Sequence, residues 1–173
     1  MTRLLVGIDP GRSGAIVALS PDREVVLALR GDGPEGYHRH APKADPNEGA
    51  MLAALQQLTE FGRPAMVVIE LPAWHAPGAR MPAGVAGRSG IEHGIWRALC
   101  AAHGWPVWLM GAKAWRKQAG IAGASGGDPK AETIAHVGRR LPGLDLYPPG
   151  KRIAHDGLAD AAGMALAALG LAK

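Results

Sequence analysis

Two short apolar runs joined by a tight turn open the chain, and no other stretch constrains the fold as strongly. The runs cover residues 4–8 and 15–19, with Pro and Gly residues in the segment 10–14 between them. This pattern is typical of a β-hairpin. Asp9 ends the first run, where a carboxylate is costly to bury unless it meets a cation or a hydrogen-bond donor. Asp9 is therefore either the first residue of an active site or a turn cap, since Asp-Pro-Gly favours turns by itself.

Further strands and helices are expected after the hairpin. A third strand at 23–30 gives three consecutive strands, and short connections of this kind predict an antiparallel arrangement. The run 65–69 is apolar throughout, as expected of a strand buried on both faces, and it ends in Glu70. Another strand is expected at 105–110. Helices are expected at 45–61, with Asp45 as N-cap and Pro46 at the first helical position, and at 91–103, 112–120, 128–141 and 152–171.

Length and composition bound the class of protein. A chain of 173 residues with 47% hydrophobic content predicts a single globular domain over 1–173 with its own core. The net charge of +4 favours an anionic partner, of which nucleic acid is the commonest kind. One cysteine, Cys100, allows no internal disulfide, which fits a reducing cytoplasm. No run reaches the 18 apolar residues of a membrane span, and no signal-peptide pattern is present, so we expect a soluble cytoplasmic protein with no membrane partner.

Two loops carry further candidate residues. The loop at 31–44 contains His38 and His40, a spacing that fits either a metal pair or a solvated loop. The loop at 71–90 is rich in Pro and Gly and contains Trp74, Arg80 and Arg88. Its length predicts a functional loop over the edge of the sheet.

Two acids begin the last predicted helix. Asp156 and Asp160 are four residues apart, so they share one side of the helix, close to the positive end of its dipole. Asp156 is explained as an N-cap, but capping does not explain Asp160. Together with Asp9 and Glu70, they make four carboxylates in apolar surroundings. Clustered carboxylates repel one another unless cations lie between them, and oxygen ligands suit Mg²⁺ or Mn²⁺. Two such ions support phosphodiester cleavage, and a polyanionic substrate would explain the excess of basic residues.

Four motifs occur in an order and spacing that resemble a known family. They are GIDPGxSGAIV, VVIE, WRKQAGI followed by DPKAET, and HDGLADAA. The sequence resembles the RuvC-type Holliday-junction resolvases of the RNase H-like superfamily over residues 4–169. The resemblance implies a five-stranded mixed sheet, with its first three strands antiparallel and helices on both faces. It also implies a homodimer that pairs through the 91–103 helix, two Mg²⁺ ions per active site for which Mn²⁺ substitutes, and paired nicks in a four-way DNA junction.

The resemblance also assigns roles to individual residues. Asp9, Glu70 and Asp160 match metal-binding acids. The fourth ligand lies at Gly157 in the cellular pattern, whereas phage-like members often have the four-residue spacing that Asp156 offers. We therefore choose Asp156 as the fourth ligand, with His155 as the alternative. The resemblance also leads us to expect that the protein is located in the cytoplasm of a bacterium or of a phage-infected host cell. Residues expected to contact DNA are Arg12, Trp74, Arg80, Arg88, Lys113, Arg116, Lys117 and Lys130.

Three of these residues have specific expected roles. Lys117 and Lys130 match catalytic basic residues near the scissile phosphate, with a solvated helix face as the alternative. Trp74 matches an aromatic side chain that stacks on unpaired bases, with packing of its loop as the alternative.

Other classes remain as competing hypotheses. Sugar kinases and actin-like ATPases share the Gly-Ile-Asp-x-Gly hairpin, but their duplicated fold does not fit into 173 residues. A relative that binds branched nucleic acid without cutting it is a second alternative, and a nuclease acting on RNA or flaps is a third. A non-cleaving relative is expected to lose acids, whereas here all four acidic positions are filled.

Overall fold

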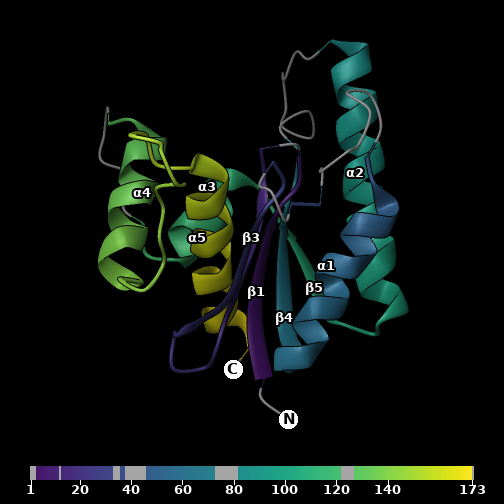
Figure 1. The fold of residues 1–173 in the computed structure, drawn as a ribbon, viewed down its shortest axis with the longest axis horizontal. Coiled ribbons are helices and arrows are strands. Elements are labelled where there is room, and N and C mark those ends of the chain that lie inside the picture. The colour runs from purple at the N-terminus through teal and green to yellow at the C-terminus, as the bar shows by residue number, and fades with distance from the viewer. Residues whose placement is uncertain are drawn as a thin grey trace.

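A mixed five-stranded sheet forms the centre of the molecule (Figure 1). The computed structural model describes residues 3–11, 13–32, 36–37, 46–72, 82–121 and 127–172. The strand order is β3-β2-β1-β4-β5, in which the first three strands along the chain pair antiparallel and the last two join in parallel. The strands are β1 (Arg3–Asp9), β2 (Ala15–Leu19), β3 (Val25–Arg30), β4 (Arg63–Glu70) and β5 (Val107–Met110). This sheet confirms the α/β prediction and the expected antiparallel start.

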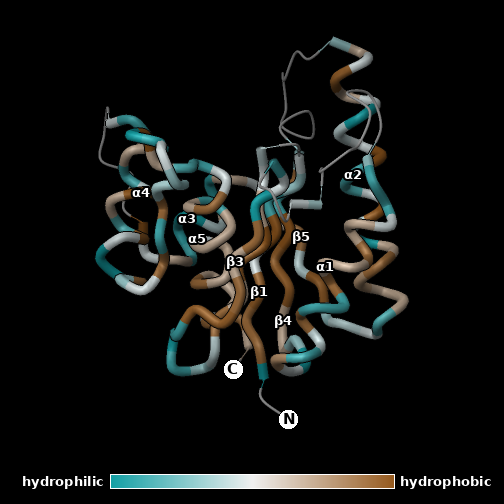
Figure 2. The backbone as a smooth tube through the Cα atoms, viewed as in Figure 1, coloured by the Kyte–Doolittle hydropathy of each residue, from teal (hydrophilic) through white to brown (hydrophobic). Residues whose placement is uncertain are grey.

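Helices cover both faces of the sheet, as predicted (Figure 1). One face packs against α1 (Glu48–Phe61) and α2 (Ala83–Ala102). The other packs against α5 (Asp156–Leu171), with α3 (Ala112–Gln118) and α4 (Pro129–Arg140) lying against α5. Hydrophobic residues are concentrated in the strands between these two layers (Figure 2). Among the described residues, none of the helices has the length and apolarity needed to cross a membrane.

The alternation of side chains along β1 and β4 determines where their acids point. In β1, Leu4, Val6 and Ile8 belong to the core beneath α1 and α2, whereas Leu5 packs on the α5 side. In β4, Val67 and Ile69 belong to the first core and Val68 to the second. Because successive strand residues point to opposite faces, the last residue of each strand, Asp9 and Glu70, faces α5.

Helix α5 lies directly on β1 because small residues line their contact. A methyl group built at Gly7 would lie 1.9 Å from the Ala161 carbonyl oxygen and 2.6 Å from the Ala165 nitrogen. Residues 157–168 of α5 are buried except for Asp160, since the sheet lies on one side of the helix and α3 and α4 lie on the other. The first two turns of α5, which carry Asp156 and Asp160, therefore lie near the ends of β1 and β4.

Several element boundaries differ from the sequence-based expectations; among them, α5 begins at Asp156 rather than at residue 152. The N-cap of α1 is Asn47 rather than Asp45, and its side chain accepts a hydrogen bond from the Ala50 nitrogen at 3.0 Å. Helix α2 begins at Ala83 rather than at residue 91, so part of the predicted loop is helical. The sequence did not predict a helix here because of the glycines at 84, 87 and 90, since glycine disfavours helices on average. Strand β5 begins at Val107, two residues later than expected. His38 and His40 lie outside the described residues.

The close contact at Gly7 yields a prediction about stability. Gly7→Ala should lower the free energy of unfolding by about 1–3 kcal/mol, because the added methyl forces α5 away from β1. Gly138→Ala in α4 is the matched control, since a methyl group built at Gly138 would have no heavy atom within 4 Å. That variant should gain about 0.5–1 kcal/mol from helix propensity. Urea unfolding measures both values, and equal effects in the two variants would contradict the close packing.

Candidate active site

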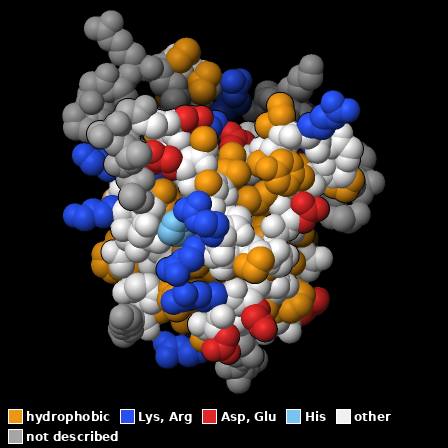
Figure 3. Space-filling view, turned by 90° about the vertical axis from the view of Figure 1, so that its left-hand side faces the viewer, with side chains coloured by type: hydrophobic (Ala, Val, Ile, Leu, Met, Phe, Trp, Pro, Cys, Tyr) orange, Lys and Arg blue, Asp and Glu red, His pale blue; other side chains and the backbone are white. Residues whose placement is uncertain are grey.

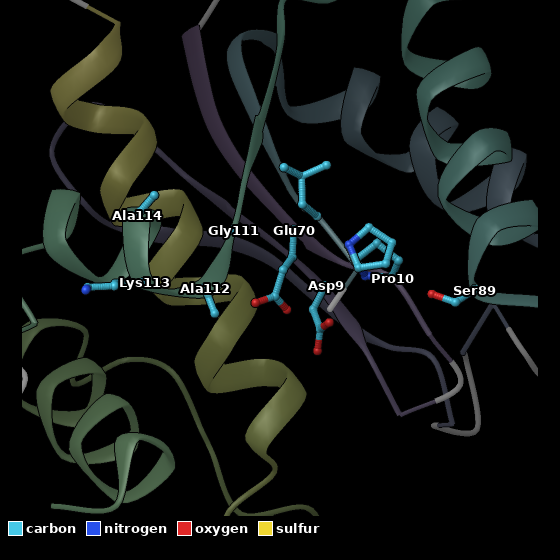
Figure 4. Close-up of a pocket in the computed structure, with 10 residues that line it drawn as sticks. Asp9, Pro10, Glu70, Ser89, Gly111, Ala112, Lys113 and Ala114 are labelled. Carbon is cyan, nitrogen blue, oxygen red and sulfur yellow. The ribbon is translucent and has the colours of Figure 1, made fainter. Parts of the chain in front are cut away.

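Asp9 and Glu70 end two neighbouring parallel strands. Ile8 of β1 pairs with Ile69 of β4, so the next residue of each strand lies at the same edge of the sheet. Figure 4 shows the two carboxylates side by side at this edge. They line a cavity of about 620 Å³ together with Pro10, Leu71, Pro72, Ser89, Gly111, Ala112, Lys113 and Ala114. The ends of β1 and β4, the start of α3 and part of α2 therefore line the same cavity.

The α5 acids act electrostatically on this pair. Burial, and next the Glu70 carboxylate, raise the pKa of Asp9 well above its ordinary value. The carboxylates of Asp160 and Asp156 raise the Asp9 pKa further, whereas the Lys130 ammonium lowers it. The other three predicted acids therefore all act on Asp9, and we call the four together the acid cluster. Burial and the neighbouring carboxylates make a negative charge at Asp9 unfavourable, and no hydrogen bond reaches its carboxylate from any residue that the structure describes.

Helix α3 supplies direct partners for two of the acids. The Trp115 indole Nε1 donates to Glu70 Oε1 at 3.1 Å, and the Arg116 guanidinium lies 3.5 Å from Asp160 Oδ1. Burial nevertheless raises the pKa of both Glu70 and Asp160, although Trp115 and Arg116 oppose this effect. Each of these two acids is thus only partly neutralised by the protein.

Asp156 differs from the other three acids because it is more exposed and has a full counter-ion. Its carboxylate forms an ion pair with the Lys130 ammonium of α4. This pairing lowers the pKa of Asp156 and raises that of Lys130. Asp156 is the first residue of α5 and not its N-cap, so the capping interpretation is wrong.

His155 caps α5 in place of Asp156. Its Nδ1 accepts a hydrogen bond from the Leu158 nitrogen at 3.1 Å, and its Nε2 lies 3.2 Å from Asp32 Oδ1. An imidazole ring can satisfy the helix N-terminus in the way that an Asp or Ser oxygen does. Both ring nitrogens of His155 are therefore engaged, just as the Asp156 carboxylate is engaged by Lys130.

Similarity to known proteins is found in the structure and not in the sequence. No family model matches the sequence, and no curated protein matches it. Solved structures of Thermus thermophilus RuvC do match. One, RuvC in complex with a Holliday junction substrate, has a TM-score of 0.61 and 18% identity, and the match covers 95% of this chain and 91% of that chain. A second RuvC structure has a TM-score of 0.59 and 22% identity, with coverages of 95% and 92%. The chain has a RuvC-like fold.

The RuvC-like fold brings some of the predicted basic residues to the acids and leaves others apart. Lys130 contacts Asp156, and Lys113 lines the cavity. Lys117 is exposed and pairs with none of the acids in the described part of the chain, whereas its neighbour Arg116 reaches Asp160. Arg88 is exposed on α2. Arg12, Trp74 and Arg80 lie outside the described residues.

Sequence reasoning missed Trp115 as part of the site. The indole ring is fully buried, and a methyl group at Gly163 of α5 would lie 2.6 Å from it. One signal was available in the sequence. A tryptophan within the otherwise basic helix of residues 112–120 has to turn inward, where its N–H needs an acceptor. A buried carboxylate at the neighbouring strand end is such an acceptor.

The four acids have the oxygen ligands that a divalent cation prefers, but in this structure they do not surround a single position. No three of the described His, Cys, Asp and Glu side chains lie close enough together to hold a metal ion as they stand. Carboxylate oxygens are the ligands that Mg²⁺ prefers, and the raised pKa values of Asp9, Glu70 and Asp160 show that positive charge is in deficit.

The pKa shifts predict opposite effects of two similar substitutions on the metal-free protein. Because the folded-state pKa of Asp9 is raised, this group favours folding below its unfolded pKa near 3.8 and loses that contribution as pH rises. Asp9→Asn should therefore raise the free energy of unfolding at pH 7 by about 1 kcal/mol, a gain typical of relieving a strained active site. This gain should disappear at acidic pH.

Asp156→Asn is the matched variant. The pKa of Asp156 is lowered by Lys130, so its contribution is present at neutral pH and is lost as pH falls through the lowered value. Asp156→Asn should cost about 0.2–1 kcal/mol at pH 7, as expected of an exposed ion pair. Urea unfolding in EDTA between acidic and neutral pH measures both effects. A loss of stability in both variants at pH 7 would contradict the charge deficit at Asp9.

Proposed function

We propose that this protein is a metal-dependent endonuclease that resolves four-way DNA junctions by paired nicks. The observation that carries the proposal is the convergence of three partly buried carboxylates with raised pKa values, Asp9, Glu70 and Asp160, at one edge of a RuvC-like sheet. Buried acids of this kind are unfavourable without cations, so their presence indicates a functional site. The four-way junction is proposed because one matched RuvC structure is a complex with a Holliday junction substrate.

The roles of the chain's residues follow from their places in the site. Asp9, Glu70, Asp160 and Asp156 would hold two Mg²⁺ ions, with Mn²⁺ as a substitute. Such ions, when bound, activate a water molecule and stabilise the leaving oxygen of a phosphodiester. Lys130 lies beside Asp156, where it can offset the charge of the DNA phosphate, whereas the Lys113 nitrogen points away from Asp9 and Glu70 (Figure 4). Trp115 keeps Glu70 oriented toward the cluster.

The basic surface suits a polyanionic substrate. Figure 3 shows Lys and Arg side chains in a row on the face where α3 and α4 lie. Lys113 and Lys117 of α3 and Lys130 of α4 are all exposed. Together with the net charge of +4, this row supports a path for the DNA backbone beside the acids.

A branched-DNA-binding protein that does not cut is the second candidate. The observation in its favour is that Arg116, Lys130 and the Trp115 indole already engage three of the acids. A group of carboxylates with permanent protein partners would stabilise the fold without binding metal. The cleavage experiment below separates the two candidates.

Cleavage assays test the proposed function directly. Purified protein with Mg²⁺ should place symmetric nicks in a labelled four-way junction and leave linear duplex and flap substrates largely intact. Asp9→Asn should lower the nicking rate more than about 100-fold, since loss of even the outer partners of a metal ligand costs 10–100-fold. EDTA should abolish nicking. Equal cutting of all three substrates would overturn the junction specificity, and undiminished cutting by Asp9→Asn would overturn the site.

Junction binding is the control for that assay. Asp9→Asn should still bind the junction, because the basic surface is unchanged, and its affinity should fall steeply as salt rises. A gel-shift or anisotropy titration at several salt concentrations measures this dependence. Junction binding with no nicking by the wild-type protein in either Mg²⁺ or Mn²⁺ would favour the non-cleaving candidate.

We further propose a homodimer, because paired nicks need two active sites. Helix α2 carries two exposed apolar side chains, Val85 at 41% and Ile91 at 56% exposure, and residues 91–103 are the proposed interface. Sedimentation at micromolar concentration should give twice the mass of one chain. Ile91→Glu should shift this to a single-chain mass, because an interface core disfavours a charge. Phe61→Glu on α1, a side chain of similar exposure at 45%, is the matched control and should leave the dimer intact.

A further inference from the structure

Two adjacent residues of α3 hold acids that come from different elements. Trp115 donates to Glu70 of β4, and Arg116 pairs with Asp160 of α5. The Arg116 guanidinium also lies over the Trp115 ring, 4.8 Å from the ring centroid. Trp115 and Arg116 therefore contact each other as well as their two acids.

Arg116 is fixed in place from a third direction. Its Nε donates to the Thr133 hydroxyl of α4 at 3.2 Å, and that hydroxyl donates to the Pro129 carbonyl at 2.9 Å. Thr133 is fully buried, and the side chains of Arg116 and Asp160 are only 22% and 14% exposed. A surface arginine samples many positions, whereas this one is held by an aromatic face, a hydroxyl and a carboxylate at once.

The position of Arg116 conflicts with a complete cation site. A carboxylate that pairs with a guanidinium presents less negative charge to a second cation, and the guanidinium charge repels that cation. This arrangement accords with the finding that no three of the described acids and histidines are ready to hold a metal. Asp9 has no comparable partner among the described residues. In the part of the chain that the structure describes, the protein therefore supplies a cationic side chain to Asp160 but none in direct contact with Asp9.

We propose that Arg116 is an internal counter-ion that holds Asp160 in the metal-free protein, so that a divalent cation has to displace it. This inference rests on the proposed function. Arg116 is thus a positioning residue that stabilises the empty site and weakens its affinity for metal. When displaced, its planar guanidinium is available to a DNA phosphate, which it can bind through two hydrogen bonds. Metal binding and DNA binding would then favour one another.

Direct measurement of Mn²⁺ binding without DNA tests the proposal. Isothermal titration or the electron paramagnetic resonance signal of free Mn²⁺ gives the affinity. Arg116→Gln should bind Mn²⁺ about 5-fold or more tightly than the wild type, the scale of coupling between linked sites. In EDTA its melting temperature should fall by a few degrees, because Asp160 loses its partner. Excess Mn²⁺ should return the melting temperature of Arg116→Gln to that of the wild type.

Matched variants exclude general effects of removing a charge. Arg3→Gln makes the same change at the opposite end of the strand that carries Asp9, and it should alter neither affinity nor melting temperature. Thr133→Val removes the hydroxyl that holds Arg116 and should also raise the affinity, which keeps the proposal testable if Arg116→Gln fails to fold. The double variant Arg116→Gln, Asp160→Asn should lose the gain.

The outcomes distinguish failure of this inference from failure of the proposed function. Unchanged or weaker Mn²⁺ binding in both Arg116→Gln and Thr133→Val, with clear binding by the wild type, would overturn the role of Arg116 and leave the nuclease proposal standing. Absence of Mn²⁺ binding in every variant at millimolar concentration would overturn both.

Discussion

The contact between α5 and β1 is the constraint on which the rest of the structure depends. Gly7 leaves no room for a side chain, and the alanines of α5 allow the helix backbone to lie against the strand. This closeness brings Asp160, one turn into α5, to the edge where β1 and β4 end. A bulkier contact would still permit a buried helix, but it would separate Asp160 from Asp9 and Glu70. Packing of the core and assembly of the acid cluster therefore depend on the same few small residues.

The cluster places more negative charge in the interior than the protein compensates. Trp115, Arg116 and Lys130 each engage one acid, yet the pKa values of Asp9, Glu70 and Asp160 remain raised. A sequence selected only for stability would replace one of these acids by an amide or an apolar residue. Functional sites commonly carry such unfavourable groups, because their ligands supply the missing interaction.

The sequence predicted the strands and acids because each depends on a local pattern. Apolar runs ending in Asp9 and Glu70 were sufficient to place both acids at strand ends, and helical spacing placed Asp156 and Asp160 on one side of α5. Other features depend on tertiary contacts. Which residue of the short basic helix α3 faces the acids is decided by a rotation of about 100° per residue, so spacing alone could not separate Arg116 from Lys117. The His155 ring that caps α5 also contacts Asp32, which is distant in sequence.

The alternation of side chains in β1 and β4 has a consequence for how such a chain tolerates insertions and deletions. Asp9 and Glu70 face α5 only because each occupies a position of the right parity in its strand. One residue added within either strand would turn its acid toward α1 and α2 and exchange the two apolar faces as well. Changes of length in the loops before β4 or after β5 leave that parity untouched. Length variation among chains of this design should therefore be concentrated in the connections, while the spacing within each acid-bearing strand stays fixed.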